Sequence, residues 1–215
     1  MVGLLLPGLL ALGLALALGG SVRNWSRTTV LGWPLVVGAF GLELVLYNPP
    51  VDREPWAMRI GPWLWLATRL LLLGVVLVNA RRAAVGRWAW WIAASGLACN
   101  ALAIAANSGH MPQSAVAAAA VWGAAHVPAG GRLDNVVLMT DQTHLAALGD
   151  VLAEPTWLPR PNVVSPGDLL VATGLAGWMY AVSKPRAILR GRDIVTRIGI
   201  PIHGAARPSR HCPRS

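Results

Sequence analysis

The sequence predicts an all-α membrane protein: a polytopic bundle of about five transmembrane helices with a small helical lid on the extracytoplasmic side. Composition is the first reason, because 55% of the residues are hydrophobic and only 13% are charged, against about 25% charged in an ordinary soluble domain. The second reason is length, since four windows hold roughly eighteen or more mainly apolar residues, enough to cross about 30 Å of hydrocarbon. So few charges do not cover a soluble surface of this size.

The apolar windows place the crossings in order at about 3–20, 28–47, 61–79, 88–107 and 166–182. No basic residue precedes the first window, and Arg23 and Arg27 follow it, so we expect a retained helix instead of a cleaved signal peptide. The fifth window opens with good helix-start chemistry. Ser165 can cap the helix, Pro166 suits the first turn, and Asp168 complements the positive end of the helix dipole.

The distribution of Lys and Arg predicts an N-terminus outside and a C-terminus in the cytoplasm. With this orientation, thirteen basic residues lie on the inner side and four on the outer side, as the positive-inside rule requires. The inner residues are Arg23, Arg27, Arg81, Arg82, Arg87, Lys184, Arg186, Arg190, Arg192, Arg197, Arg207, Arg210 and Arg214. We therefore expect a multi-pass protein of the cell inner (plasma) membrane.

This orientation divides the chain into four parts. Residues 1–107 hold four helices, 108–164 form the extracytoplasmic lid, 165–183 form the fifth helix, and 184–215 form a basic cytoplasmic tail. The stretch NSGHMP is a helix stop at the outer surface, because Gly109 permits a left-handed cap and Pro112 cannot continue a helix. Within the lid we expect one short helix near 113–125 and a second near 142–148, with Leu145 and Leu148 facing the bundle.

Several short motifs occur in a fixed order along the outer segment. They are Asn-x-Gly-x-Met-Pro at 107–112, His126, Thr-x-Leu-x-x-Leu-Gly-Asp at 143–150, Pro159, and Ser-x-Gly-Asp at 165–168. In this order the chain resembles an uncharacterised family of bacterial integral membrane proteins, a domain of unknown function. The resemblance is close over the outer segment and fifth helix, and elsewhere concerns hydropathy alone. It implies the membrane architecture and no activity.

The outer segment also gathers polar groups that could form a site. The candidate outer polar cluster comprises Asn107, His110, His126, Asp141, His144, Asp150 and Asp168. Imidazoles and carboxylates together can bind zinc or perform acid–base chemistry. However, no His-Glu-x-x-His motif is present, so we expect no metal, with His110, His126 and His144 as the candidate ligands if there is one. Structural roles at helix ends are favoured for Asp150, Asp168 and Asn107.

Two ionisable residues fall deep within predicted spans, Glu43 on the second and Arg69 on the third. Charges in a membrane need partners. We expect an intramembrane ion pair that joins the two helices. A transport or proton-relay site, or two side chains that reach the interface separately, are the alternatives.

The fourth window is rich in small residues and carries Asn100 near its middle, which predicts a central packing helix. Together these features favour a non-catalytic accessory, assembly or scaffold subunit, without a cofactor. The alternatives are a metal-dependent or hydrolytic enzyme that uses the outer cluster, and a carrier of small solutes or lipids. The expected partners are the bilayer, with anionic headgroups at the basic tail, and a membrane protein or second copy. Nucleic acid is not expected, because no nucleic-acid motif accompanies the basic residues.

Overall fold

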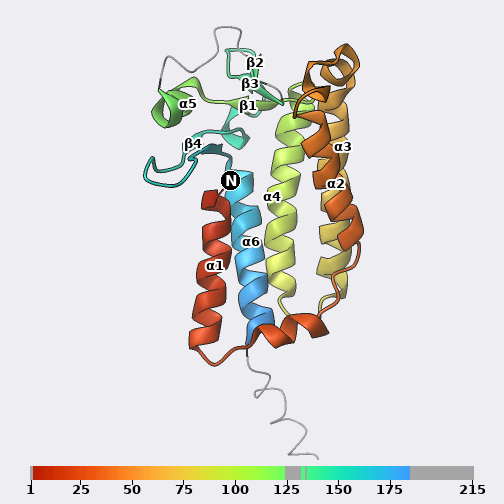
Figure 1. The fold of residues 1–215 in the computed structure, drawn as a ribbon, viewed down its shortest axis with the longest axis vertical. Helices are drawn as coiled ribbons and strands as arrows, with labels where there is room; N and C mark the ends of the chain where they lie inside the picture. Colours follow the sequence, from red (N-terminus) through yellow and green to blue (C-terminus); the bar gives the residue numbers. More distant parts are fainter. Residues whose placement is uncertain (1, 124–131, 134, 185–215) are drawn as a thin grey trace, which may run out of the picture. The chain divides into compact units, whose positions relative to one another are not determined.

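The computed structural model describes residues 2–123, 132–133 and 135–184. The chain divides into two units, Met1–Lys184 and Pro185–Ser215. The basic tail, with the lipid-headgroup contact predicted for it, lies outside the described residues, as does His126. The first unit is mostly helical, and its described part holds six α-helices and five short β-strands (Figure 1).

Five of the helices run along one another, and the chain order differs from the spatial order. Helix α6 packs against α1 on one side and α4 on the other, α4 packs against α3, and α3 packs against α2 (Figure 1). Their bounds are α1 Val2–Ala17, α2 Trp33–Leu46, α3 Pro55–Arg82, α4 Arg87–Ala106 and α6 Pro166–Ser183. Helix α6, the last in the described part of the chain, is therefore inserted between the first and the fourth.

Two helices in the described part of the chain, α3 and α4, are long and apolar enough to cross a membrane. Helix α3 has 28 residues and begins at Pro55, earlier than the predicted start at 61. Proline suits a first helical turn because its missing N–H needs no partner there, and the helix then continues through Pro62. Helices α1 and α2 are shorter than predicted, with 16 and 14 residues. Gly32, at φ 77°, precedes α2 and separates it from the 3₁₀ turn Val22–Arg27.

Helices α4 and α6 meet at a seam of small residues. A Cβ added at Gly174 would lie 2.6 Å from the backbone nitrogen of Ala93, and one added at Gly96 would overlap the carbonyl oxygen of Gly167. Only glycine lets two helix backbones approach so closely. The small-residue face of α4 is thus used within the chain.

At the end of the bundle away from the outer segment, polar side chains hold the connecting segments against the helices. The Asn79 amide on α3 accepts from the Leu31 N–H at 3.0 Å and donates to the Leu31 carbonyl at 2.9 Å, which holds the chain just before α2. The Trp25 indole donates to Ser183 Oγ at 2.8 Å. These bonds tie the connections to the helices beside them.

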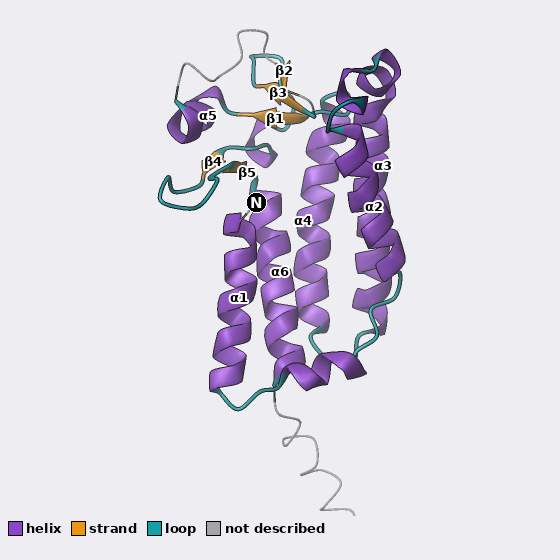
Figure 2. Cartoon of the chain, in the orientation of Figure 1, coloured by secondary structure: helices purple, strands orange, loops and turns teal. Residues whose placement is uncertain are grey.

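The outer segment contains small sheets as well as a helix, which corrects the prediction of a purely helical lid (Figure 2). One sheet has the order β1-β3-β2, with β1 parallel to β3 and β2 antiparallel to it. A second sheet pairs β4 with β5 antiparallel. The strands are β1 Met111–Gln113, β2 Arg132–Leu133, β3 Val136–Leu138, β4 Leu152–Ala153 and β5 Val163–Val164, and the helix is α5 Ala115–Trp122. Two- and three-residue strands carry too little alternation for the sequence to show them.

The helix predicted at 142–148 is wrong. Only a 3₁₀ turn forms, at Ala146–Leu148. The Thr143 hydroxyl accepts from the Thr140 N–H at 2.8 Å, and Leu145 has a left-handed φ of 52°. Both features interrupt a regular helix, since a side chain replaces the backbone acceptor and the backbone leaves the helical region. Consequently Leu145 is exposed, whereas Leu148 packs inward.

The outer segment is attached to the bundle at the end of α4. Asn107 accepts from the His144 N–H at 3.1 Å and donates to the His144 carbonyl at 2.8 Å. Gly109, at φ 86°, turns the chain out of the helix and into β1. An apolar cluster of Trp65, Ala103, Ile104 and Met111, with Tyr47, Leu66, Val136 and Leu148 packed against it, then joins helices to strands.

Candidate functional site

A cavity of about 390 Å³ lies where the outer segment meets the helices. Ligand pockets in proteins typically measure about 300–1,000 Å³. Its polar lining residues are Glu43, Arg69, Asn100, Gln113, Asn135, Asp150, Asn162 and Asp168, and its apolar ones are Trp65, Ile104, Met111, Trp122, Val136, Val163 and Val164. Helices α2, α3, α4 and α6 thus supply one part of the wall, and the outer segment supplies the rest.

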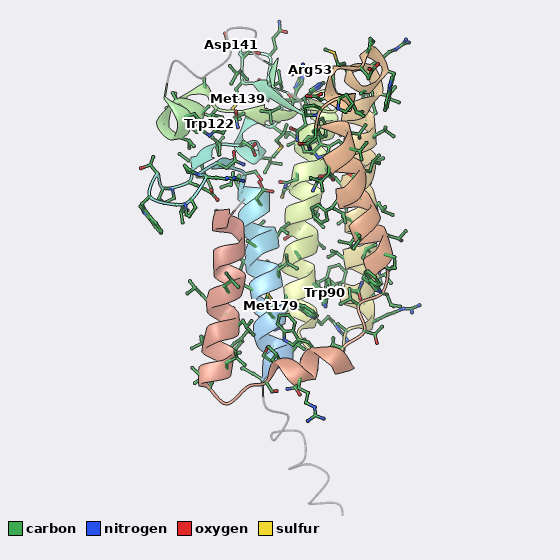
Figure 3. The ribbon with its side chains drawn as sticks, in the orientation of Figure 1. Arg53, Trp90, Trp122, Met139, Asp141 and Met179 are labelled. Atoms are coloured by element: carbon green, nitrogen blue, oxygen red, sulfur yellow. The ribbon has the colours of Figure 1, made fainter. Side chains whose placement is uncertain are left out.

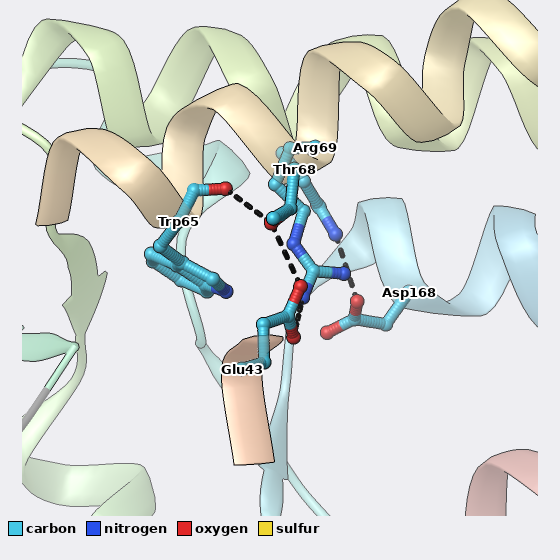
Figure 4. Close-up of polar contacts among 6 residues, drawn as sticks. Glu43, Trp65, Thr68, Arg69 and Asp168 are labelled. Atoms are coloured by element: carbon cyan, nitrogen blue, oxygen red, sulfur yellow. Dashed lines mark hydrogen bonds and ion pairs between the residues drawn. The ribbon is translucent and has the colours of Figure 1, made fainter. Parts of the chain in front are cut away.

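The ion pair between Glu43 and Arg69 forms one wall of the cavity (Figure 4). Thr68 on α3 donates to Glu43 Oε1 at 2.8 Å, and the guanidinium lies 5.4 Å from the ring centre of Trp65. The two charged side chains are 17% and 16% exposed. The structure therefore brings the two predicted intramembrane charges together, on neighbouring helices and beside a cavity.

A closed set of hydrogen bonds joins α4 to the start of α6. Asn100 donates to Asp168 Oδ1 at 2.8 Å, and its carbonyl oxygen accepts from the Ser165 hydroxyl at 2.9 Å. Ser165 and Asp168 also form the predicted capping box, in which the Ser165 hydroxyl accepts from the Asp168 N–H at 2.9 Å and Asp168 Oδ2 accepts from the Ser165 N–H at 3.0 Å. Each polar atom of the three side chains has a partner, so this corner is rigid.

Asp150, in the outer segment, also lines the cavity, but its side chain is not part of such a network. Its backbone is bonded to β1, since its N–H donates to the Pro112 carbonyl at 2.8 Å and its carbonyl accepts from the Ser114 N–H at 2.9 Å. Its side chain, only 9% exposed, faces the cavity and makes no hydrogen bond within the described residues. Burial, with a smaller contribution from the nearby Asp168 carboxylate, raises the pKa of the Asp150 carboxyl to about 8. At neutral pH the carboxyl is mostly protonated.

Two further polar atoms at the cavity wall are buried without a partner in the described part of the chain: Gln113 Oε1 and Arg69 Nε. Gln113 is 2% exposed. An unmade hydrogen bond in the interior costs about 1–3 kcal/mol, so folded proteins rarely leave two of them together. Both atoms belong to residues that line the same cavity.

The outer polar cluster does not assemble as a whole. Asp150 and Asp168 reach the cavity, whereas His110, Asp141 and His144 do not line it. His110 Nδ1 lies 3.0 Å from the Ser108 carbonyl oxygen, and Asp141 is exposed at the outer edge of the segment (Figure 3). Among the described residues, no group of three or more His, Cys, Asp or Glu side chains could hold a metal ion.

Sequence reasoning missed several lining residues, namely Trp65, Gln113, Trp122, Asn135 and Asn162, and also Thr68, which donates to Glu43 beside the cavity. One signal existed for Thr68, because it directly precedes Arg69, the predicted partner of Glu43. Gln113 and Asn162 stand in short loop-like stretches, where a polar residue is ordinary. Gln113 and Asn162 reach the same cavity because of the positions of β1 and β5, and strands this short show no pattern in the sequence.

A family model matches residues 27–180 and carries the description Family of unknown function (DUF5317). The chain belongs to this family. The resemblance to a family of unknown function is thus confirmed in that coarse form. The match begins after α1 and ends within α6, so it contains every residue that lines the cavity. No curated protein and no solved structure matches the chain.

Membership of DUF5317 brings no activity with it, because the family description states none. The chemistry of the cavity is therefore the guide to function. Its lining includes an ion pair, a hydrogen-bonded corner, tryptophan side chains and three polar groups that have no hydrogen-bond partner among the described residues.

Proposed function

We propose that this DUF5317 protein is a five-pass membrane protein that binds a small polar molecule in the cavity beneath its outer segment. The observation that carries the proposal is a set of polar groups around one cavity that make no hydrogen bond within the described residues: Gln113 Oε1, Arg69 Nε and the Asp150 carboxyl. A carrier or receptor for a small solute fits this set, because the ligand would supply the missing hydrogen bonds.

Exposed apolar side chains support the membrane part of the proposal. Large hydrophobic residues stand exposed on all five long helices, among them Leu10, Leu44, Leu71, Leu102 and Leu175, with exposed fractions of 40–67%. A soluble protein rarely exposes continuous apolar surface of this kind. In a bilayer these side chains would lie in hydrocarbon, and the cavity would lie near the outer end of the bundle.

The proposed topology keeps the N-terminus outside and the C-terminus in the cytoplasm, and single cysteines can test it. In a variant without Cys99 and Cys212, Asp141→Cys should react with a membrane-impermeant maleimide in intact cells. Ala84→Cys, exposed in the connection between α3 and α4, should react only after permeabilisation. The reverse pattern would invert the topology, and equal labelling of both sites in intact cells would contradict the membrane proposal.

Ligand binding is tested by mass spectrometry of the protein purified in a mild detergent. We expect wild type to retain a small molecule and Gln113→Leu to retain much less of it, because the buried acceptor is lost. Gln142→Leu, an exposed glutamine outside the cavity, is the matched control. Equal retention by the two variants would contradict binding in this cavity.

The accessory or scaffold role predicted from the sequence stays a prediction. One reason for it was the small-residue face of α4. In the structure this face packs against α6, where Gly96 of α4 and Gly174 of α6 make close contacts. This use within the chain leaves less of that face for a partner, so the carrier alternative is the better supported one.

A further inference from the structure

We propose that the cavity selects a primary ammonium group that carries a hydrogen-bond acceptor close to it, as in a small amino alcohol or the ethanolamine headgroup of a lipid. This inference rests on the proposed ligand-binding function. Two observations support it: the cavity has more carboxyl groups than cations, and its unpartnered polar atoms line the same space.

The cavity holds more carboxyl groups than cations. Glu43, Asp150 and Asp168 line it, against Arg69 alone, although the chain as a whole has a net charge of +9 and only nine acidic residues. Arg69 is bound to Glu43. Within the described part of the chain, Asp150 and Asp168 have no cationic partner, and an ammonium group between them would supply one.

The unpartnered atoms point to the same chemistry. Gln113 Oε1 and the Asp150 carboxyl both need a donor, and an ammonium has three N–H groups to give. Arg69 Nε needs an acceptor, which is why the ligand should carry an oxygen near its nitrogen. Trp65 and Trp122 at the wall offer aromatic faces that favour an organic cation.

Binding of such a cation should compete with a proton on Asp150. The facing charged groups are Asp168 on α6, Glu43 on α2 and Arg69 on α3. With a pKa of about 8, the ionised fraction of Asp150 rises about 20-fold to 25-fold between pH 6.5 and pH 8.5. The affinity for the ammonium should rise with it, because the ligand prefers the ionised carboxylate.

The experiment measures binding of radiolabelled ethanolamine to the full chain in detergent by scintillation proximity. We expect the apparent Kd to fall about 20-fold from pH 6.5 to pH 8.5. Asp150→Asn, which resembles the protonated acid and should fold, should bind weakly at both pH values. Asp141→Asn, exposed and outside the cavity, should behave as wild type. A pH-independent Kd in wild type, or unchanged binding in Asp150→Asn, would overturn the ammonium assignment.

Two further ligands separate the inference from the proposed function. Ethylene glycol and glycolate have similar size and no positive charge. If either binds as tightly as ethanolamine, and Gln113→Leu abolishes that binding, the cavity binds ligands but the ammonium assignment fails. If none of the three binds and purified protein retains no small molecule, both proposals fail.

The source of the amine is decided in nanodiscs. Phosphatidylethanolamine in the nanodisc should compete with free ethanolamine if a lipid headgroup reaches the cavity, whereas phosphatidylglycerol should not. Competition assigns the site to the lipid, and its absence assigns the site to a free amine. Competition by phosphatidylglycerol as well would overturn the ammonium assignment, because that headgroup carries no amine.

Discussion

The seam between α4 and α6 lies beside the cavity, and the two share Asn100 and Asp168. The buried polar groups of the seam are hydrogen-bonded, whereas several of those at the cavity have no hydrogen-bond partner among the described residues. In the seam, Asn100, Ser165 and Asp168 satisfy one another completely. At the cavity, Asp150 and Gln113 are also buried, with 9% and 2% exposure, but the Asp150 carboxyl and Gln113 Oε1 make no hydrogen bond in the described part of the chain. The seam stabilises the fold, whereas the unpartnered groups at the cavity wall cost stability.

Gly96→Ala should break the seam with the largest effect. Its new methyl group would overlap the carbonyl oxygen of Gly167, and overpacked helices must separate, at about 3 kcal/mol or more. Thermal unfolding in detergent measures the loss. Gly74→Ala on α3 is the control, because nothing lies within 4 Å of its added Cβ and alanine is the better helix former. If both variants unfold at the wild-type temperature, α4 and α6 do not meet as described.

Arg69→Met should destabilise by about 2–3 kcal/mol, less than for a fully buried pair, because the two side chains keep 17% and 16% exposure. Glu43→Gln alone should also destabilise. The double variant should be milder than the sum of both, since neither charge is then left alone. The unfolding temperatures of wild type, the two single variants and the double variant form a double-mutant cycle that measures this coupling. Additive losses would mean that the two charges contribute independently.

Asn100→Ala should cost about 2–3 kcal/mol, because Asp168 loses a donor and the Ser165 hydroxyl loses its acceptor. Ser95→Ala is the control on the same helix. Its hydroxyl donates to the Ile92 carbonyl in an exposed position at 2.7 Å, so about 0.5 kcal/mol or less is expected. Comparable losses in the two variants would contradict a special role for the seam network.

Gln113→Leu should leave stability unchanged or change it in the opposite direction from the variants of the seam. Because Gln113 Oε1 is buried without a partner, its removal should leave the unfolding temperature unchanged or raise stability by up to about 1 kcal/mol. The measurement uses ligand-free protein. A loss as large as that of Asn100→Ala would show that Gln113 is a structural residue and that the cavity wall is not strained.

Some features of this protein were determined by the sequence alone. Apolar windows placed the five long helices, and the sequence predicted Ser165 as the cap of α6 and Asp168 as a favourable charge in its first turn, where the structure shows a capping box. Gly109 predicted the left-handed helix end. These features depend on residues that are neighbours along the chain, so local chemistry is sufficient to predict them. The pairing of Glu43 with Arg69 was inferred from the cost of leaving charges in apolar spans.

Tertiary structure alone decided the cavity. Asp150, Gln113 and Asp168 come together only because α6 inserts between α1 and α4, and because β1 bonds to the backbone of Asp150. The strands are too short to show a period, and the left-handed Leu145 prevents the regular helix that the sequence predicted at 142–148. A residue's burial and its lack of a partner depend on contacts between distant segments, and hydropathy along the chain carries no record of those contacts.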